Sequence, residues 1–112
     1  MIKVVETGAV IARCPLCADS FFQRLTGMIT RNFSPSLDAA IFRNCNAIHT
    51  FGMRFAIDVL FITGDNRIAA VFPDVAPWKT CGTKGRKITA VELPAGSIAK
   101  FGIKCGDFVE FT

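Results

Sequence analysis

The sequence contains no tyrosine, one tryptophan and one histidine, so rings that also carry a polar group are scarce. It has no apolar run approaching the roughly 20 residues that a membrane-spanning helix needs. Its first residues include an acid and a glycine where a secretion signal would be continuously apolar. We therefore predict no membrane segment and a cytoplasmic location, or a domain separated from its export signal.

The 112 residues are 51% hydrophobic and 20% charged, which is typical of a globular protein and excludes a disordered chain. This length favours a single domain spanning residues 1–112. The eleven phenylalanines offer large apolar areas without a hydroxyl group. They are therefore expected to pack rather than to carry chemistry.

Cysteine is neither abundant nor even in number, because the chain holds five. That usage favours reduced thiols over the disulfide framework of a small secreted protein. The net charge of +4 is modest, although a basic stretch follows Trp78 and comprises Lys79, Lys84, Arg86 and Lys87. Because one aromatic ring accompanies these charges, we predict a solvated loop and no nucleic-acid partner.

Short strands dominate the predicted secondary structure. Alternating or continuous apolar residues between turn formers predict strands at 2–5, 9–12, 39–42, 57–62, 67–72, 88–93 and 108–111. Apolar residues at helical spacing predict one main N-terminal helix that begins at Pro15 and runs to Met28. A helical turn at 98–101 is expected after a Ser97 cap. These elements predict a mainly β (α+β) fold, a small β-barrel-like domain.

Four segments carry a resemblance to a known family. Residues 48–62 read Ile-His-Thr-Phe-Gly-Met-Arg-Phe-Ala-Ile-Asp-Val-Leu-Phe-Ile, with Cys45 just upstream, and further matches occur at 24–28, 91–96 and 102–107. In this order they resemble the family called domain of unknown function 192. The resemblance implies a shared fold and a shared site, but no activity. Cys14 and Cys17 lie outside the family's pattern and inherit no role.

Asp58 lies within an otherwise apolar strand, where a charge is costly unless it is paired. As the second residue of that strand, it is predicted to share a face with Leu60 and Ile62. One interpretation is that Asp58 tethers the loop from His49 to Arg54. The other is that it lines a pocket and orients His49.

His49 is the side chain that ordinarily titrates near neutral pH, and its loop is rich in small and polar residues. Glu92 ends a predicted strand, where it either joins a titratable cluster with His49 and Asp58 or accepts N–H groups of the turn at 95–97. Met53 is expected to fill the core or floor the pocket. The candidate pocket therefore comprises Cys45, His49, Thr50, Met53, Asp58 and Glu92.

The cysteines permit a second kind of site. Cys14 and Cys17 have the spacing of a zinc knuckle or redox pair, and Cys45 with His49 would complete a tetrahedral zinc set. A zinc ribbon repeats the close cysteine pair, and this sequence does not. We therefore commit to no cofactor, and keep zinc as an alternative to unpaired structural thiols.

Four functions are compatible with these residues, and the first is favoured because the sequence contains no complete catalytic motif. The first is a module that binds a small molecule or peptide at the predicted pocket. The second is a small hydrolase or lyase that uses His49 and Asp58 as an acid–base pair. The third is zinc or redox chemistry, and the fourth is an accessory subunit of a larger assembly. Whether the protein is an enzyme stays open at this point.

Overall fold

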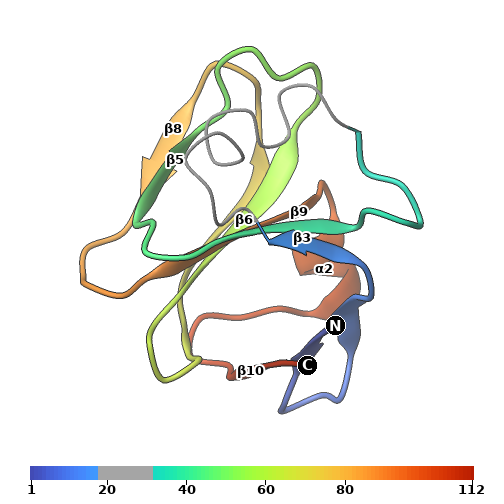
Figure 1. The fold of residues 1–112 in the computed structure, drawn as a ribbon, viewed down its shortest axis with the longest axis vertical. Coiled ribbons are helices and arrows are strands. Elements are labelled where there is room, and N and C mark those ends of the chain that lie inside the picture. Colours follow the sequence, from blue (N-terminus) through green and yellow to red (C-terminus); the bar gives the residue numbers. More distant parts are fainter. Residues whose placement is uncertain (18–31) are drawn as a thin grey trace.

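The chain folds mainly into short β-strands, shown in Figure 1 by a computed structural model that describes residues 1–17 and 32–112. Within these ranges it forms β1 (Ile2–Val4), β2 (Val10–Ala12), β3 (Pro15–Cys17), β4 (Ala39–Phe42), β5 (Ala47–His49), β6 (Ile57–Ile62), β7 (Ile68–Val75), β8 (Thr80–Gly82), β9 (Thr89–Pro94), helix α2 (Ser97–Phe101) and β10 (Val109–Phe111). The prediction of a mainly β fold is confirmed.

These strands form three sheets. The first has the order β10-β1-β2 and places the two termini side by side (Figure 1). The second and largest has the order β3-β4-β9-β6-β7, in which only β3 and β4 pair in parallel. The third is the antiparallel pair β5-β8. The five-stranded sheet is therefore the centre of the architecture.

Each face of the central sheet carries its own hydrophobic cluster. The face toward the β10-β1-β2 sheet holds the first cluster, to which β6 contributes Leu60 and Ile62. The opposite face holds the second cluster, built on Ile57, Val59 and Phe61 and packed against side chains of β5 and β8. All six residues of β6 are buried. The prediction of a strand buried on both faces is confirmed.

The barrel is not found, and this part of the fold prediction needs correction. The described strands lie in three separate sheets with free edges rather than in one closed sheet. The reason is that the central sheet buries both of its faces against other elements, so that it does not need to close on itself.

The start of the predicted N-terminal helix also needs correction. Pro15 begins strand β3, which pairs in parallel with β4, instead of the first turn of a helix. The carboxylate of Asp38 accepts the N–H groups of Arg13 and Cys14 at 2.7 and 2.8 Å, which fixes this segment beside β4. The rest of the predicted helix, 18–28, lies outside the described residues.

The helix α2 occupies the predicted position, but its cap differs. Gly96 is the N-cap residue and takes a left-handed conformation with a φ of 93°, while the Ser97 hydroxyl donates to the Pro94 carbonyl at 2.6 Å. Glycine suits that conformation because it has no side chain to clash. Across the described residues, no helix has the length and apolar character needed to cross a membrane.

Candidate functional site

Asp58 is fully buried and holds two distant segments through backbone hydrogen bonds. Its Oδ1 accepts the N–H of Asp74 at 2.8 Å, and its Oδ2 accepts the N–H of Ile98 at 2.7 Å. Ile98 lies in the first turn of α2, where N–H groups have no partner within the helix. Asp58 thus satisfies one of them and gains from the favourable field at that helix end.

The contact with Asp74 explains how β7 runs past a proline. The register between β6 and β7 shifts opposite Asp58, since Ile57 pairs with Val75 while Val59 pairs with Phe72. Pro73 lies in this irregularity, where its missing N–H removes no hydrogen bond from the ladder. The freed N–H of Asp74 turns to the Asp58 carboxylate. The strand predicted at 67–72 is therefore too short, because β7 continues through Pro73 to Val75.

These contacts agree with neither of the two interpretations of Asp58, since its carboxylate accepts N–H groups of Asp74 and Ile98. The face prediction was correct, because the carboxylate lies on the side of Leu60 and Ile62 and contacts α2. The interpretation that Asp58 tethers the loop from His49 to Arg54 is wrong, because the segments that it tethers are α2 and the end of β7. The predicted His49–Asp58 pair is not formed.

Glu92 lies on the opposite face of the same sheet. Its partners in register are Ala40 and Val59, both members of the second hydrophobic cluster, whereas Asp58 faces away from this cluster beside Leu93. Glu92 is 4% exposed, and its Oε1 has no hydrogen-bond partner among residues 1–17 and 32–112. This contradicts the prediction that Glu92 accepts N–H groups of the turn at 95–97. Burial raises the pKa of Glu92 from 4.5 to about 7.

A thiol shares this environment. Burial, and secondarily the nearby Glu92 carboxylate, raise the pKa of Cys81 to about 11. Cys45 also packs against the second cluster, and its thiol donates to the Ala47 carbonyl at 3.1 Å. The Cys81 thiol is therefore neutral around pH 7 rather than an activated nucleophile of the kind expected at a redox site.

Thr50 joins the predicted loop to the segment before β8. Its buried hydroxyl donates to the Ala76 carbonyl at 2.7 Å and accepts the N–H of Lys79 at 2.9 Å. Its backbone N–H donates to the Lys79 carbonyl, and its carbonyl accepts the N–H of Trp78. Thr50 therefore fixes the position of Trp78 relative to the loop.

Phe51 and Met53, which flank Gly52, lie in opposite environments. Gly52 takes a φ of 80°, a left-handed conformation that glycine adopts readily, and the chain turns there. Met53 beyond the turn is buried in the second cluster, so its predicted role as a core filler is confirmed. Phe51 before the turn is 44% exposed.

Three aromatic side chains are stacked at this surface, and we call His49, Phe51 and Trp78 the ring stack. The centroids of His49 and Phe51 are 4.9 Å apart, and those of Phe51 and Trp78 are 5.9 Å apart, with interplanar angles of 27° and 23°. Nδ1 of His49 accepts the N–H of Phe51 at 3.3 Å. His49 thus belongs to an exposed aromatic surface rather than to a carboxylate cluster.

The structure therefore divides the six predicted pocket residues into three groups. Cys45, Met53 and Glu92 lie on the side of the second cluster. His49 belongs to the ring stack, and Thr50 fixes the backbone beside it. Asp58 lies on the opposite face of the central sheet and contacts α2. The expected cluster of His49, Asp58 and Glu92 does not exist as one centre.

The proposed zinc set is not assembled either. In the described part of the chain, no three His, Cys, Asp or Glu side chains are grouped so that they could hold a metal ion. Cys14 and Cys17 are exposed thiols at and before β3, and Cys45 and His49 lie in the separate environments given above. The four residues therefore do not form a common ligand sphere.

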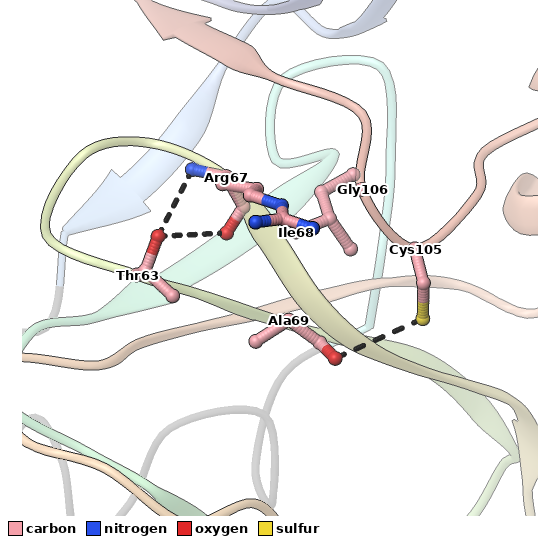
Figure 2. A pocket seen from close by; sticks show the side chains of 6 residues that line it. All are labelled: Thr63, Arg67, Ile68, Ala69, Cys105 and Gly106. Carbon is pink, nitrogen blue, oxygen red and sulfur yellow. Dashed lines mark hydrogen bonds between the residues drawn. The ribbon is translucent and has the colours of Figure 1, made fainter.

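Two small cavities lie away from these groups. One of about 260 Å³ is lined by Thr63, Arg67, Ile68, Ala69, Cys105 and Gly106. Figure 2 shows two hydrogen bonds between Thr63 and the backbone of Arg67, and one that the Cys105 thiol donates to the Ala69 carbonyl. The other, of about 270 Å³, is lined by Asn32, Phe33, Phe55, Ala56, Pro94 and Ala95. None of the six predicted residues lines either cavity.

Comparison with known proteins supports the resemblance noted in the sequence. The model of the DUF192 family, described as an uncharacterized ACR, matches residues 5–111. The chain belongs to the DUF192 family. No curated protein matches this DUF192 chain.

Two solved structures share the fold of this DUF192 chain. A protein of unknown function from Novosphingobium aromaticivorans DSM 12444 is 19% identical with a TM-score of 0.79, covering 98% of this chain and 83% of that chain. A protein described as a "putative transcription regulator" from Sinorhizobium meliloti 1021 is 22% identical with a TM-score of 0.73, covering 84% and 78% respectively. At these identities the likeness shows the fold alone.

Sequence reasoning missed the exposed rings of this DUF192 chain. Trp78 is 68% exposed, and Phe51 was included among rings expected to pack. Two features of the sequence could have indicated this exposure. Phe51 precedes a glycine inside the family motif at 48–62, and Trp78 follows a proline and precedes a lysine. Such positions favour surface turns over core strands.

Proposed function

We propose that the chain is a binding module whose contact surface is the ring stack. The observation that carries the proposal is the exposure of two large rings, Phe51 and Trp78, which stack on each other while Phe51 also stacks on His49. Contiguous exposed apolar surface in a folded protein marks interaction sites. Tryptophan in particular is enriched among the residues that dominate binding energy.

The rigidity of this surface supports binding rather than incidental exposure. Thr50 holds the backbone of both contributing segments through hydrogen bonds to Ala76, Trp78 and Lys79. Met53 anchors the same loop in the second cluster. Because the rings are already ordered, a ligand does not have to bear the entropy of ordering them.

The charge around the ring stack supports an acidic partner. The two segments that build and extend it, 47–54 and 76–87, contain no aspartate or glutamate. Their basic residues are all exposed, and none forms an ion pair with an acid of the described residues: Arg54, Lys79, Lys84, Arg86 and Lys87. Complementary charge speeds association and discriminates against other partners.

The neighbouring strands support a peptide as the partner. In the described sheets, β5 and β8 pair only with each other, so each has an edge to which no other described strand is paired. An extended peptide is able to add to such an edge while its side chains reach adjacent surfaces. We infer that the occupant is an extended acidic peptide segment with an apolar or aromatic side chain that packs on Trp78.

Trp78 provides the assay, because it is the single tryptophan of the chain. Its fluorescence is titrated with a blocked peptide rich in Asp and Glu that carries one central phenylalanine. We expect a saturable change that weakens as salt is raised, since exposed charges are screened. The same peptide with lysine in place of its acids is expected to bind at least roughly tenfold more weakly.

A matched pair of variants locates the contact. Phe51→Ala removes the middle ring of the stack, whereas Phe108→Ala removes a phenylalanine that is 41% exposed and borders β10. Loss of binding in Phe51→Ala alone supports the proposal. Equal affinity for both variants overturns it, as does tighter binding of a single-stranded oligothymidylate than of the acidic peptide.

A further inference from the structure

The backbone pairing of β5 with β8 fixes which groups of each strand face outward. Thr50 donates its N–H to the Lys79 carbonyl at 2.9 Å. At the other end of the pair, Thr83 donates its N–H to the Asn46 carbonyl at the same distance. In an antiparallel ladder, residues that hydrogen-bond to the partner strand alternate with residues whose N–H and C=O groups face away from it. The residues that face away are therefore Ala47 and His49 in β5, and Thr80 and Gly82 in β8.

The outer edge of β8 is exposed and unpaired within the described part of the chain. Thr80 and Gly82 are both exposed, and their backbone groups form no hydrogen bond with residues 1–17 or 32–112. The edge of β5 differs, because the Ala47 carbonyl already accepts the Cys45 thiol at 3.1 Å. A row of unpaired N–H and C=O groups is a template for a further strand. Of the two edges, that of β8 is therefore the better template.

The charges at the two ends of β8 match an acidic strand. Lys79 directly precedes β8, while Lys84 and Arg86 follow it, and all three side chains are exposed. The loop that carries Lys84 and Arg86 is fixed to the segment before β5, since the Gly85 carbonyl accepts the Asn46 side-chain amide at 3.3 Å. An acidic strand along β8 thus meets a cation near each of its ends, and such complementarity favours association.

The same edge adjoins the ring stack. Ile48 and Cys81 are partners in register and pack against the second cluster. The next pair, His49 and Thr80, therefore has its side chains on the opposite, outer face. Trp78 precedes Thr80 by two residues, and a strand added to β8 lies about 5 Å away. Outer-face side chains of such a strand are within reach of the Trp78 ring.

We propose that the acidic peptide binds by adding a strand to the outer edge of β8, where Thr80 and Gly82 exchange backbone hydrogen bonds with it. This strand addition rests on the function proposed above, and it specifies which edge and which residues of the chain hold the peptide backbone. Each of the two residues offers an N–H donor and a C=O acceptor. The backbone bonds supply affinity for an extended segment, while its acidic and apolar side chains supply specificity.

An N-methyl scan of the acidic peptide tests the backbone pairing through Trp78 fluorescence. Each peptide residue in turn is replaced by its N-methyl form, which removes one N–H and keeps the side chain. We expect binding to weaken at least roughly tenfold at alternate positions around the central phenylalanine, and much less at the positions between them. A uniform effect, or no effect, overturns the strand addition and leaves the proposed function standing. An unmodified peptide that does not change the fluorescence overturns both.

A matched pair of proline variants distinguishes the two edges. Thr80→Pro removes an outward-facing N–H of β8, and Ala47→Pro removes an outward-facing N–H of β5. Strands tolerate proline where the missing N–H takes no part in the ladder. We expect Thr80→Pro to weaken binding of the unmodified peptide at least roughly tenfold, and Ala47→Pro to change it by less than about twofold. Equal affinities of the two variants, or the reverse order, overturn the proposal.

Amide hydrogen exchange of the wild type tests the same contact without a variant. The amides of Thr80 and Gly82 are expected to exchange at least roughly tenfold more slowly once the peptide is bound, whereas the rate of the Ala47 amide stays the same. Slower exchange at Ala47 alone, or at none of the three, overturns the assignment to β8. This measurement decides the question even if a proline variant fails to fold.

Discussion

Replacing Glu92 by glutamine is expected to change how the stability of the protein depends on pH. Burial raises the pKa of Glu92 from 4.5 to about 7. The folded state therefore holds a proton that the unfolded chain has released between these two values. Because stability rises with pH only where the unfolded state binds more protons, this group makes the wild type less stable as pH rises from about 4.5 to 7.

The magnitude follows from the distance between the two pKa values. At ~1.4 kcal/mol per pH unit, the interval corresponds to a loss of about 3 kcal/mol, complete above pH ~7. Glu92 is 4% exposed, so solvent screening does not reduce this figure greatly. Glutamine has nearly the same shape and does not titrate, so Glu92→Gln is expected to avoid the loss.

The assay is urea unfolding of both proteins across a series of pH values. The difference in free energy of unfolding between wild type and Glu92→Gln cancels the other titrating groups. It should shift by about 3 kcal/mol in favour of the variant between pH ~4.5 and ~7, equivalent to roughly 2 M urea in midpoint.

Glu110→Gln is the matched control, since Glu110 is half-exposed and pairs with Lys3 at the surface. Its free energy of unfolding should follow that of the wild type within about 1 kcal/mol at every pH. Parallel curves for wild type and Glu92→Gln would refute the reasoning, because they would mean that the folded state gives Glu92 a charge-stabilising partner.

Three further predictions test other parts of the site. Asp58→Asn should lower the free energy of unfolding by about 3 kcal/mol, because an amide cannot accept both backbone N–H groups. His49→Ala should change that free energy by less than ~1 kcal/mol. Equal effects of the two variants in thermal denaturation would contradict the separate roles of Asp58 and His49. Thr50→Val should lower the free energy of unfolding by about 2 kcal/mol and broaden the indole NMR signal of Trp78. An unchanged indole signal would argue against the role of the Thr50 hydroxyl in fixing the segment of Trp78. Cys81 should react with iodoacetamide at pH ~8 at least tenfold more slowly than exposed Cys105, and comparable rates by mass spectrometry would contradict its burial and raised pKa.

Strand positions and faces were accessible from the sequence where the pattern was local. The apolar runs at 39–42 and 57–62 match β4 and β6 residue for residue. The period of two along a strand placed Asp58 on the correct face. By contrast, β3, β5 and β8 were not predicted, because these three-residue strands do not lie in longer apolar runs such as those at 2–5 and 9–12, which contain the equally short β1 and β2.

The arrangement of the sheets was not accessible in the same way. Whether strands close into a barrel depends on pairing between distant segments, and one strand's pattern does not encode it. Strand β6 is apolar at nearly every position because both faces of the central sheet are covered. A strand in a barrel wall packed on both sides would have the same apolar pattern, so this pattern does not distinguish the two arrangements.

The sequence predicted that Asp58 needs hydrogen-bond partners, but it did not predict which groups supply them. A carboxylate buried in an apolar strand needs hydrogen-bond donors, and Asp58 has them. Its partners, however, are the backbone N–H groups of Asp74 and Ile98, which side-chain identity does not reveal. The exposure of the ring stack likewise depends on Thr50, whose hydroxyl reaches Ala76, 26 residues along the chain.

The central claim is that Trp78, stacked on Phe51, contacts an acidic peptide. The most direct measurement follows the single indole N–H resonance of the wild type and of Phe51→Ala during titration with that peptide. We predict a saturable shift in the wild type and at least a roughly tenfold weaker response in Phe51→Ala. A wild-type resonance that stays in place at saturating peptide, or an identical response in the variant, would contradict the claim.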